Sequence, residues 1–471
     1  MVRILCNLPL ECFAPREEWS GVELVTFGPG DRMLVDGVHF PFDIEFDPST
    51  GSFRELEALL PRGFRPDFVL LYWPDQEPLP AGLQHCPFPV VGVVSDYNLT
   101  LPWIAGLWPF FDVLLCDRRG VDLFAALSFA DVRYFCQYTF KKPFHRIWPD
   151  AGPRDIDIGF AGNLNPVVQR ERAPWIERIR RLADRGVRVD IRTGVHGADY
   201  GRFLNRCRIG FDRSIRGEMN LRAFEVPACG AALLIERENL EVADFLEPGE
   251  ECVLYGDDLE DVVLDLLADP KRLSRIAERG HQRIQHYSMG RRLEDLAELL
   301  SGIRTGRPRV SEGEALLARA TAMAATWASG PAAVRAALDA CERMPSDPRP
   351  FNLLGLATLR WRGAEGCEQA LQLWRKASAL DPHYVPAAVN AAELLSFAGR
   401  EDLQRPALSA LEARLGREVE WRDLDGPCMP LGFSERAVDR ALALGRAVLR
   451  NEPPSFARAL ASGLLSCGPA G

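Results

Sequence analysis

Short apolar runs alternate with helical or irregular segments through residues 1–300. In residues 1–150 these runs are MVRILCNL, VELVTF, DFVLLYW, PVVGVVSD and DVLLCD. From 155 to 300 they are DIDIGFAG, VRVDIRTG, RIGFDRS, AALLIE and ECVLYG. Apolar runs rich in Val and Leu that are separated by helices are typical of parallel sheets covered on both faces. The alternation therefore predicts two doubly wound α/β domains, one over 1–150 and one over 151–305.

A proline- and glycine-containing segment separates the two predicted α/β domains. This segment, FHRIWPDAGPRD (144–155), has the composition of a linker. In doubly wound sheets, ligands bind beyond the carboxyl ends of the strands. We therefore expect a ligand site where the strands of 151–305 end.

Residues 311–471 differ in composition, because Ala, Leu and Arg dominate there and β-branched residues are few. We expect an all-α domain. Segment 351–382 resembles a tetratricopeptide repeat, with about three residues more in its loop than the usual 34-residue period allows. The first helix matches at Phe351, Leu354 and Gly355, and the second matches at Ala370, Trp374, Ala377 and Pro382. Such helix pairs must stack to bury their apolar faces, and a stack presents an extended binding surface.

The composition argues against several classes of protein. The 471 residues are 47% hydrophobic and 26% charged, as expected for a soluble protein of two or three domains. The net charge of −10 argues against a general nucleic-acid binder. No apolar run reaches the roughly 18 residues of a membrane span. The 12 cysteines have no C-x-x-C spacing, and no metal-ligand pattern is visible. We expect a cytoplasmic protein with no metal and no bound cofactor.

Residues 216–236 combine charged side chains with a turn from a helix into a strand. The stretch RGEMNLRAFEVPACG leads directly into AALLIE, and Gly230 stands where the helix must end. Asn220, Arg222 and Glu225 are spaced so that they share one end or face of the helix. An arginine can bind a phosphate, and a glutamate can accept hydrogen bonds from vicinal sugar hydroxyls. Beside a helix start, this combination suits a nucleotide sugar.

Several motifs in one order resemble those of the GT-B glycosyltransferases. NLRAFEVPACGAALLI is similar to their donor-site signature, and it is closest to the group-1 and CgeB-like branch with its N-x-R-x-F-E-x-x-x-C-G run. DIDIGFAGN (155–163) resembles the first strand and glycine loop of that branch, and residues 241–296 resemble its closing region. The resemblance covers 155–300 well and 1–150 loosely. It implies a GT-B fold, in which two facing Rossmann-like domains bind the donor and the acceptor.

The resemblance implies that Glu225 binds hydroxyls of the donor, although the same residue could lie on an ordinary helix surface. Arg222 could reach a phosphate or pair with Glu225 along the helix. Asn220 could contact the donor or only cap the helix. Arg213 or Arg216 would supply the positive charge that a metal-independent enzyme needs for its diphosphate leaving group.

The spacing of two glutamates departs from the family pattern. Glu218 and Glu225 are separated by six residues in the sequence, whereas the longer family motif separates its glutamates by seven. The role of Glu218 and the choice between retaining and inverting chemistry therefore stay open.

Turns after other strands add further candidates. Backbone N–H groups of Gly162 and Asn163 could cradle a phosphate, or the glycine could only be required by the turn. Thr193 ends the next strand, near the expected position of the base and ribose. Asp96 ends VVGVVSD and could be the catalytic base that deprotonates an acceptor hydroxyl, or it could cap a turn. Residues 73–75, after another strand, could line the acceptor site.

These features predict a glycosyltransferase that moves a sugar from a nucleotide-diphosphate donor to an acceptor hydroxyl. The expected partners are the nucleotide sugar and an acceptor, which could be a protein bound by the helical repeats. One alternative is a non-catalytic interaction protein with a degenerate GT-B platform. Another is a nucleotide-sugar epimerase of the same fold. No G-x-G-x-x-G follows any strand, which argues against a nicotinamide dehydrogenase.

Overall fold

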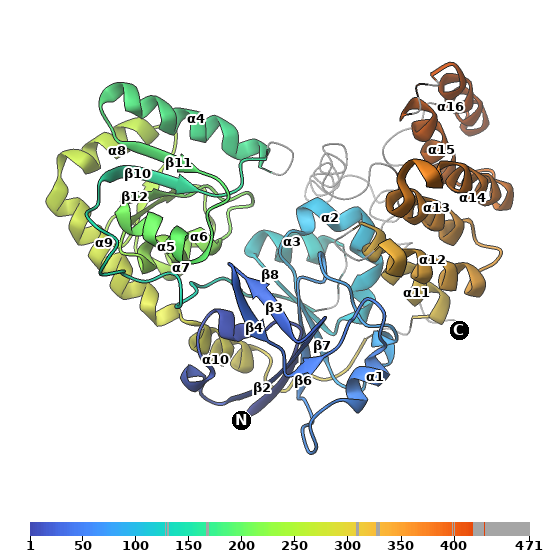
Figure 1. Ribbon diagram of the computed structural model, residues 1–471, viewed down its shortest axis with the longest axis horizontal. Coiled ribbons are helices and arrows are strands. Elements are labelled where there is room, and N and C mark those ends of the chain that lie inside the picture. The colour runs from blue at the N-terminus through green and yellow to red at the C-terminus, as the bar shows by residue number, and fades with distance from the viewer. Residues whose placement is uncertain are drawn as a thin grey trace. The chain divides into compact units, whose positions relative to one another are not determined.

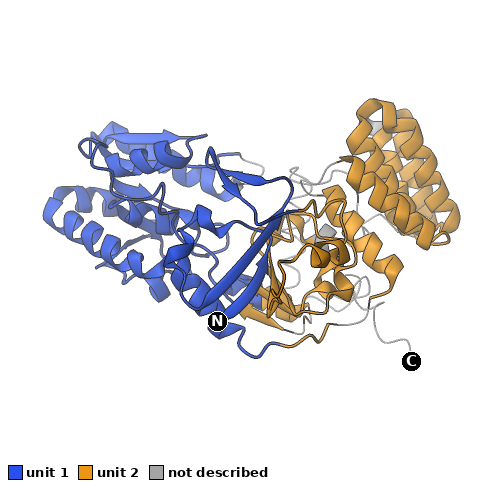
Figure 2. Ribbon diagram, turned by 60° about the horizontal axis from the view of Figure 1, so that its bottom comes forward, with its two compact units in different colours: residues 1–45, 116–121, 134–303 blue, residues 46–115, 122–133, 304–471 orange. Residues whose placement is uncertain are grey.

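The computed structural model describes residues 1–417, except 128, 130, 166–168, 308, 309, 326–329, 398 and 400, and it also describes Cys428. Two compact units, each built from several chain segments, make up the protein (Figure 2). Unit 1 contains residues 1–45, 116–121 and 134–303, and unit 2 contains 46–115, 122–133 and 304–471. The last part of the predicted helical domain, 418–471 apart from Cys428, lies outside the described residues, as does Trp327 in one of its predicted helices.

Unit 1 contains a five-stranded parallel sheet in the order β11-β10-β12-β13-β14 (Figure 1). Its strands are β10 (Ile156–Ala161), β11 (Val189–Arg192), β12 (Cys207–Phe211), β13 (Ala232–Glu236) and β14 (Val253–Tyr255). Every neighbouring pair is parallel. The carboxyl ends of all five strands therefore lie at one edge, which we call the carboxyl edge, and their beginnings lie at the amino edge.

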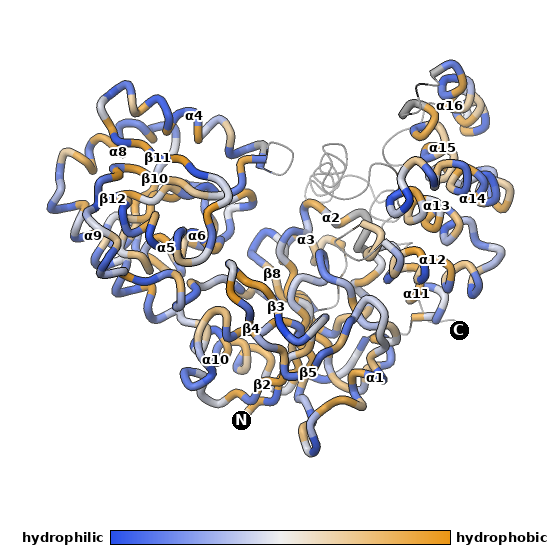
Figure 3. The backbone as a smooth tube through the Cα atoms, in the orientation of Figure 1, coloured by the Kyte–Doolittle hydropathy of each residue, from blue (hydrophilic) through white to orange (hydrophobic). Residues whose placement is uncertain are grey.

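Helices cover both faces of this sheet. Alternate residues of β13 enter two different hydrophobic clusters, because side chains of a strand point to opposite faces. Leu234 packs in the cluster that includes residues of α4, α8 and α9, whereas Leu233 packs in the cluster that includes residues of α5 and α6. Figure 3 shows the mixed hydropathy of the surrounding helices. The helices are α4 (Ala173–Arg181), α5 (Gly197–Arg206), α6 (Leu221–Ala228), α7 (Val242–Phe245), α8 (Leu259–Ala268) and α9 (Pro270–Ile284). Helix α10 (Met289–Leu299) lies instead beside the strand of residues 22–28 (Figure 1).

Three short helical pieces lie between β10 and β11 in the described part of the chain. Two short 3-10 helices, η5 (Arg170–Arg172) and η6 (Leu182–Arg185), flank α4. Pro174 lies in the first turn of α4. A proline there has no N–H to bond to a preceding turn, so the regular helix begins next to it.

The first 45 residues of unit 1 form two small sets of strands. Strands β1 (Val2–Cys6), β2 (Val22–Gly28) and β5 (Ile44–Glu45) pair in parallel in the order β5-β2-β1. Strands β3 (Arg32–Val35) and β4 (Val38–Pro41) form an antiparallel hairpin. Its turn residues Asp36 and Gly37 have φ angles of 51° and 82°. Asp-Gly is the usual choice for such a left-handed turn.

Unit 2 also contains parallel strands. Strands β6 (Phe68–Tyr72), β7 (Val90–Val93) and β8 (Val113–Cys116) pair in that order. Helix α1 (Phe53–Ala58) begins at a capping box formed by Ser52 and Glu55, and α2 (Tyr97–Ile104) follows β7. Helix α3 (Arg118–Ala126) and strand β9 (Val132–Tyr134) have residues in both units.

The rest of unit 2 is helical. Trp374 of α14 is fully buried, and a Cβ atom on Gly355 of α13 would lie 2.5 Å from its ring. Arg319 of α11 is buried and donates hydrogen bonds to the carbonyl oxygens of Pro48, Ser49 and Leu79. The helices are α11 (Glu312–Ala325), α12 (Gly330–Arg343), α13 (Pro348–Arg362), α14 (Cys367–Leu380), α15 (Val385–Phe397) and α16 (Glu401–Leu415). The predicted α-helical C-terminal region is thus confirmed over the described residues, and its tetratricopeptide character stays a prediction. Among those residues, no helix is long and apolar enough to cross a membrane.

Candidate functional site

Two residues of the 216–236 segment converge on a buried carboxylate at the carboxyl edge. Asn220 is the N-cap of α6, where its side chain accepts a hydrogen bond from the N–H of Ala223. Its Nδ2 donates to Oδ1 of Asp212 at 3.1 Å, and Nη1 of Arg222 donates to the same oxygen at 2.7 Å. Asp212 directly follows β12 and is fully buried. The sequence analysis did not single out Asp212, although it is the first acidic residue after that strand.

Arg222 also explains the glycine after β10. The guanidinium lies over the Phe160 ring at 4.4 Å, and Nη2 donates to the carbonyl oxygen of Ala161 at 3.1 Å. A Cβ atom on Gly162 would lie 2.3 Å from that Nη2 atom. The N–H of Gly162 donates to the carbonyl oxygen of Arg192 at 3.1 Å, so it is engaged within the sheet and is not open to a phosphate here. Gly162 is present because Arg222 needs the space.

A second arginine, Arg172, organises the neighbouring loops. Its Nη1 and Nη2 each donate at 3.0 Å, to the carbonyl oxygens of Asn163 and Arg213 respectively. Burial and the positive charge of Arg222 lower the pKa of Arg172 to about 10. Both guanidinium groups lie over the Phe160 ring. This part of the edge is therefore strongly electropositive, and Arg172 is a cation that the sequence analysis did not identify.

The two arginines predicted to serve the leaving group have different surroundings. Arg213 lies over the Trp175 ring at 4.9 Å and pairs with exposed Glu238 at 3.2 Å. Arg216 is buried, with Nε 3.0 Å from Oδ2 of Asp117 and Nη2 3.8 Å from Glu218. Glu218 also accepts a hydrogen bond from the N–H of Arg216, and burial raises the pKa of Glu218. The charge of Arg216 is thus balanced inside the protein.

Glu225 is buried in α6 with 5% of its surface exposed, so it is not an ordinary surface residue. Its side chain accepts no hydrogen bond from any residue that the structure describes. The nearest charged or polar contact is Nδ1 of His145, 3.6 Å from Oε1. That nitrogen accepts a hydrogen bond from the N–H of Lys141 at 3.1 Å, and burial lowers the pKa of His145. Because the ring is neutral at pH 7, the contact is not an ion pair.

Three separate chain segments complete the surroundings of Glu225. Nζ of Lys141 pairs with Oδ2 of Asp36 at 2.7 Å, where Asp36 is the tip of the β3–β4 hairpin. Burial alone would lower the pKa of Lys141, but Glu225 and Asp36 raise it overall. The ring of Tyr200 packs edge-on against His145 at 5.5 Å. Lys141, Asp36 and Tyr200 lie far from the 216–236 segment in sequence, so no local pattern could have indicated them.

Thr193 and Asp96 belong to other segments of the chain. Thr193 follows β11 and is exposed. Asp96 follows β7 in unit 2, where its Oδ2 accepts a hydrogen bond from Nε2 of Gln76 at 2.9 Å. The N–H of Asp96 donates to Oδ2 of Asp75 at 2.7 Å. Burial, and then the negative charge of Asp96, raise the pKa of Asp75 to about 7. Trp73, at the end of β6, has a φ angle of 54°, which is unusual for a non-glycine residue.

Comparison with known proteins identifies the domain that carries the carboxyl edge. Residues 148–298 match a family model described as glycosyl transferase-like. This segment includes the five-stranded sheet and Glu225, Arg222 and Asn220. It is a glycosyltransferase-like domain. No curated protein matches the chain.

Solved structures resemble parts of the chain weakly. An alpha-glucosyltransferase in complex with UDP-glucose and DNA has a TM-score of 0.45 and 11% identity, over 64% of this chain and 98% of that one. Anabaena HepE, in complex with UDP and glucose, has a TM-score of 0.40 and 12% identity, over 64% and 100%. Sucrose-phosphate synthase from Thermosynechococcus elongatus also has a TM-score of 0.40 and 12% identity, over 64% and 99%.

The predicted fold is confirmed at a coarse level. The protein has α/β sheets of parallel strands, followed by a helical region. Its GT-B arrangement stays a prediction. The CgeB-like subtype, the metal independence and the roles of individual site residues stay predictions. Within the described residues, no group of three or more His, Cys, Asp and Glu side chains could hold a metal ion.

Proposed function

We propose that the protein transfers a sugar from a nucleotide-diphosphate donor to an acceptor hydroxyl, and that the donor binds at the carboxyl edge of the five-stranded sheet. One observation carries the proposal. The carboxylate of Glu225 is buried within the glycosyltransferase-like domain, yet no described residue donates a hydrogen bond to it. Every other buried carboxylate of that edge named above, Asp212 and Glu218 included, has a donor.

The Glu225 oxygens are not among the fully buried polar atoms that lack a partner, so they still reach solvent and a ligand can reach them. Vicinal hydroxyls of a sugar or ribose could donate two hydrogen bonds to Glu225 in place of water. Lys141 and Arg222 lie near Glu225, and the negative charge of Glu225 attracts both cations. The donor would thus bind with its hydroxyls at Glu225.

The diphosphate of the donor needs positive charge in a metal-independent reaction. Arg172 and Arg222 both lie over the Phe160 ring, and burial and the charge of Arg222 lower the pKa of Arg172. Asp212 already balances the charge of Arg222, as Asp117 and Glu218 balance that of Arg216. We therefore assign the leaving-group charge to Arg172, with Arg213 beside it.

We further propose that Asp96 is the base for the acceptor and that the helical region recruits a protein acceptor. The support for Asp96 is its position after a buried parallel strand and its contact with a second carboxylate, Asp75. The support for recruitment is the series of helices α11–α16, since stacked helix pairs offer an extended surface to a peptide.

Turnover of a nucleotide-sugar panel tests the proposal on the full-length protein. We expect one donor to be consumed, with release of a nucleoside diphosphate and either free sugar or a glycosylated protein in a cell extract. If the radiolabelled sugar is incorporated into macromolecules and a protease then releases the label, the acceptor is a protein. An epimerised nucleotide sugar without nucleoside diphosphate would identify an epimerase. If the protein neither binds nor consumes any of the donors, the non-catalytic platform is favoured.

A further inference from the structure

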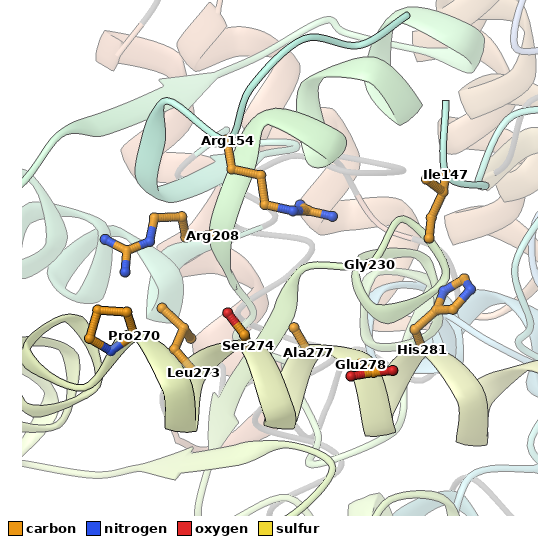
Figure 4. Close-up of a pocket in the computed structure, with 10 residues that line it drawn as sticks. All are labelled: Ile147, Arg154, Arg208, Gly230, Pro270, Leu273, Ser274, Ala277, Glu278 and His281. Carbon is orange, nitrogen blue, oxygen red and sulfur yellow. The ribbon is translucent and has the colours of Figure 1, made fainter. Parts of the chain in front are cut away.

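A cavity of about 490 Å³ lies at the amino edge of the five-stranded sheet. Its position follows from its lining, because Arg154 precedes β10, Arg208 lies at the start of β12 and Gly230 precedes β13. Figure 4 shows side chains of helix α9 on one side of the cavity and Arg154 on the other. Glu225 does not line this cavity; it lies in α6, five positions before Gly230.

Arg154 brings a positive charge to the cavity without a balancing carboxylate. Its Nη1 donates to the carbonyl oxygen of Cys207 at 2.5 Å, and its Nη2 donates to that of Cys229 at 2.9 Å. These carbonyls lie at the ends of α5 and α6, which carry only partial negative charge. No described carboxylate pairs with Arg154, its Nε makes no hydrogen bond to a described residue, and burial lowers its pKa. A partly buried guanidinium in this state favours an anion beside it.

Arg208 adds to this positive charge. Its Nη1 lies 3.0 Å from Oδ1 of Asp157. The same carboxylate accepts two side-chain hydrogen bonds from Arg188, at 2.7 and 2.9 Å. Two guanidinium groups therefore share one carboxylate. Arg154 and Arg208 thus both bring positive charge to the lining of the cavity, with their guanidinium groups pointing in opposite directions (Figure 4).

Helix α9 brings polar side chains to the cavity (Figure 4). Nδ1 of His281 donates to the carbonyl oxygen of Pro227 at 2.9 Å, because a carbonyl can only accept. This bond leaves Nε2 of His281 for a ligand. Ser274 and Glu278, from the same helix, also line the cavity. These three groups can bind hydroxyl hydrogens of a ligand.

We propose that this cavity binds a small phosphorylated polyol, such as a sugar phosphate. The two arginines would attract the phosphate to this cavity, and the hydroxyls would face His281, Ser274 and Glu278 on α9. A phosphate ion alone would leave these acceptors unused in so large a cavity. A nucleotide fits less well, because the lining contains no Phe, Tyr or Trp on which a base could stack.

Calorimetric titration of the full-length protein with glucose 6-phosphate, glucose and inorganic phosphate tests this site. Arg208→Met is compared with Arg188→Met, because both remove one positive charge that Asp157 binds, but only Arg208 lines the cavity. We expect saturable binding of glucose 6-phosphate that Arg208→Met weakens about 10-fold or more, since hydrogen bonds to charged groups are worth about 1.5–3 kcal/mol. Arg188→Met and Glu225→Gln should retain the wild-type affinity.

Ser274→Ala, a small change on an exposed part of α9, tests the polyol end of the cavity. It should weaken glucose 6-phosphate binding and leave phosphate binding unchanged. Equal affinity for phosphate and glucose 6-phosphate would overturn the polyol assignment. The site would be overturned if glucose 6-phosphate did not bind, or if both arginine variants lost affinity for it equally. It would also be overturned if only Glu225→Gln lost affinity. Because the last result would place the ligand at the carboxyl edge, it would leave the proposed transferase function intact.

Discussion

The two edges of the five-stranded sheet carry unpaired charges of opposite sign. At the carboxyl edge, Arg222 pairs with buried Asp212, and the group left without a partner is the carboxylate of Glu225. At the amino edge, Arg154 is held by carbonyl oxygens, and no described carboxylate balances it. The carboxyl edge is therefore prepared for hydroxyl donors, and the amino edge for an anion. The sign of the unpaired charge thus determines which chemical group each edge can bind.

The largest effect is expected for Glu225→Gln, which removes the unpaired charge at the carboxyl edge. If two sugar hydroxyls donate to this carboxylate, the loss of about 1.5–3 kcal/mol for each bond lowers kcat/KM about 10²- to 10⁴-fold. Steady-state kinetics with the donor found in the panel measure it. Glu177→Gln, on the exposed surface of α4, is the matched control and should behave like the wild type. Unchanged kcat/KM in Glu225→Gln would remove Glu225 from the donor site.

Arg222→Met should destabilise the fold strongly, because it leaves Asp212 charged and buried without its cation. Removal of one partner of a buried ion pair costs about 3–5 kcal/mol. Denaturant unfolding measures the loss. The double variant with Asp212→Asn should recover much of it, since neither charge then remains. If the single and double variants were equally unstable, Arg222 would act mainly through its packing on Phe160.

Two carboxylates should give opposite dependences of stability on pH. Burial raises the pKa of Glu241, near the carboxyl edge, to about 7 from the ordinary 4.5. The folded state therefore holds this proton more tightly than the unfolded state. The free energy of unfolding of the wild type should fall relative to that of Glu241→Gln as pH rises from about 4.5 to about 7.

At the amino edge, the hydrogen bond from Arg188 lowers the pKa of Asp157 below the ordinary 3.8. The advantage of the wild type over Asp157→Asn should therefore be present at neutral pH and disappear as pH falls below about 4. Thermal unfolding of the three proteins across this pH range measures both trends. Parallel trends for the two variants would contradict the opposite treatment of charge at the two edges.

The smallest effect is expected for Asn220→Ala, which removes the N-cap of α6 and should cost about 1 kcal/mol of stability. Asn220→Ser keeps a capping oxygen and should retain most of the stability. If Asn220 only caps the helix, KM for the donor should rise only in a variant that has lost stability. A raised KM in stable Asn220→Ser would show that the amide contacts the donor.

The sequence allowed one edge to be predicted and not the other, for a physical reason. Asn220, Arg222 and Glu225 lie within two helical turns, so their spacing alone brings them together. Asp36, Lys141 and His145 reach Glu225 from distant segments, and the amino-edge cavity combines residues from the linker, two strands and α9. Contacts of this kind depend on tertiary packing. The βα alternation predicted the strands of the five-stranded sheet and β1, β2, β6, β7 and β8, but not β3, β4, β5 and β9. These four strands have only two to four residues each and contain no long apolar run.

Binding of the nucleotide sugar and of its nucleoside diphosphate to wild type, Glu225→Gln and Arg208→Met is the most direct test. If the donor lies at the carboxyl edge with its sugar at Glu225, Glu225→Gln should lower the affinity for the nucleotide sugar at least 10-fold. It should lower the affinity for the nucleoside diphosphate much less. Arg208→Met should bind both ligands as the wild type does. A donor affinity that falls in Arg208→Met and is unchanged in Glu225→Gln would contradict the assignment of the donor site.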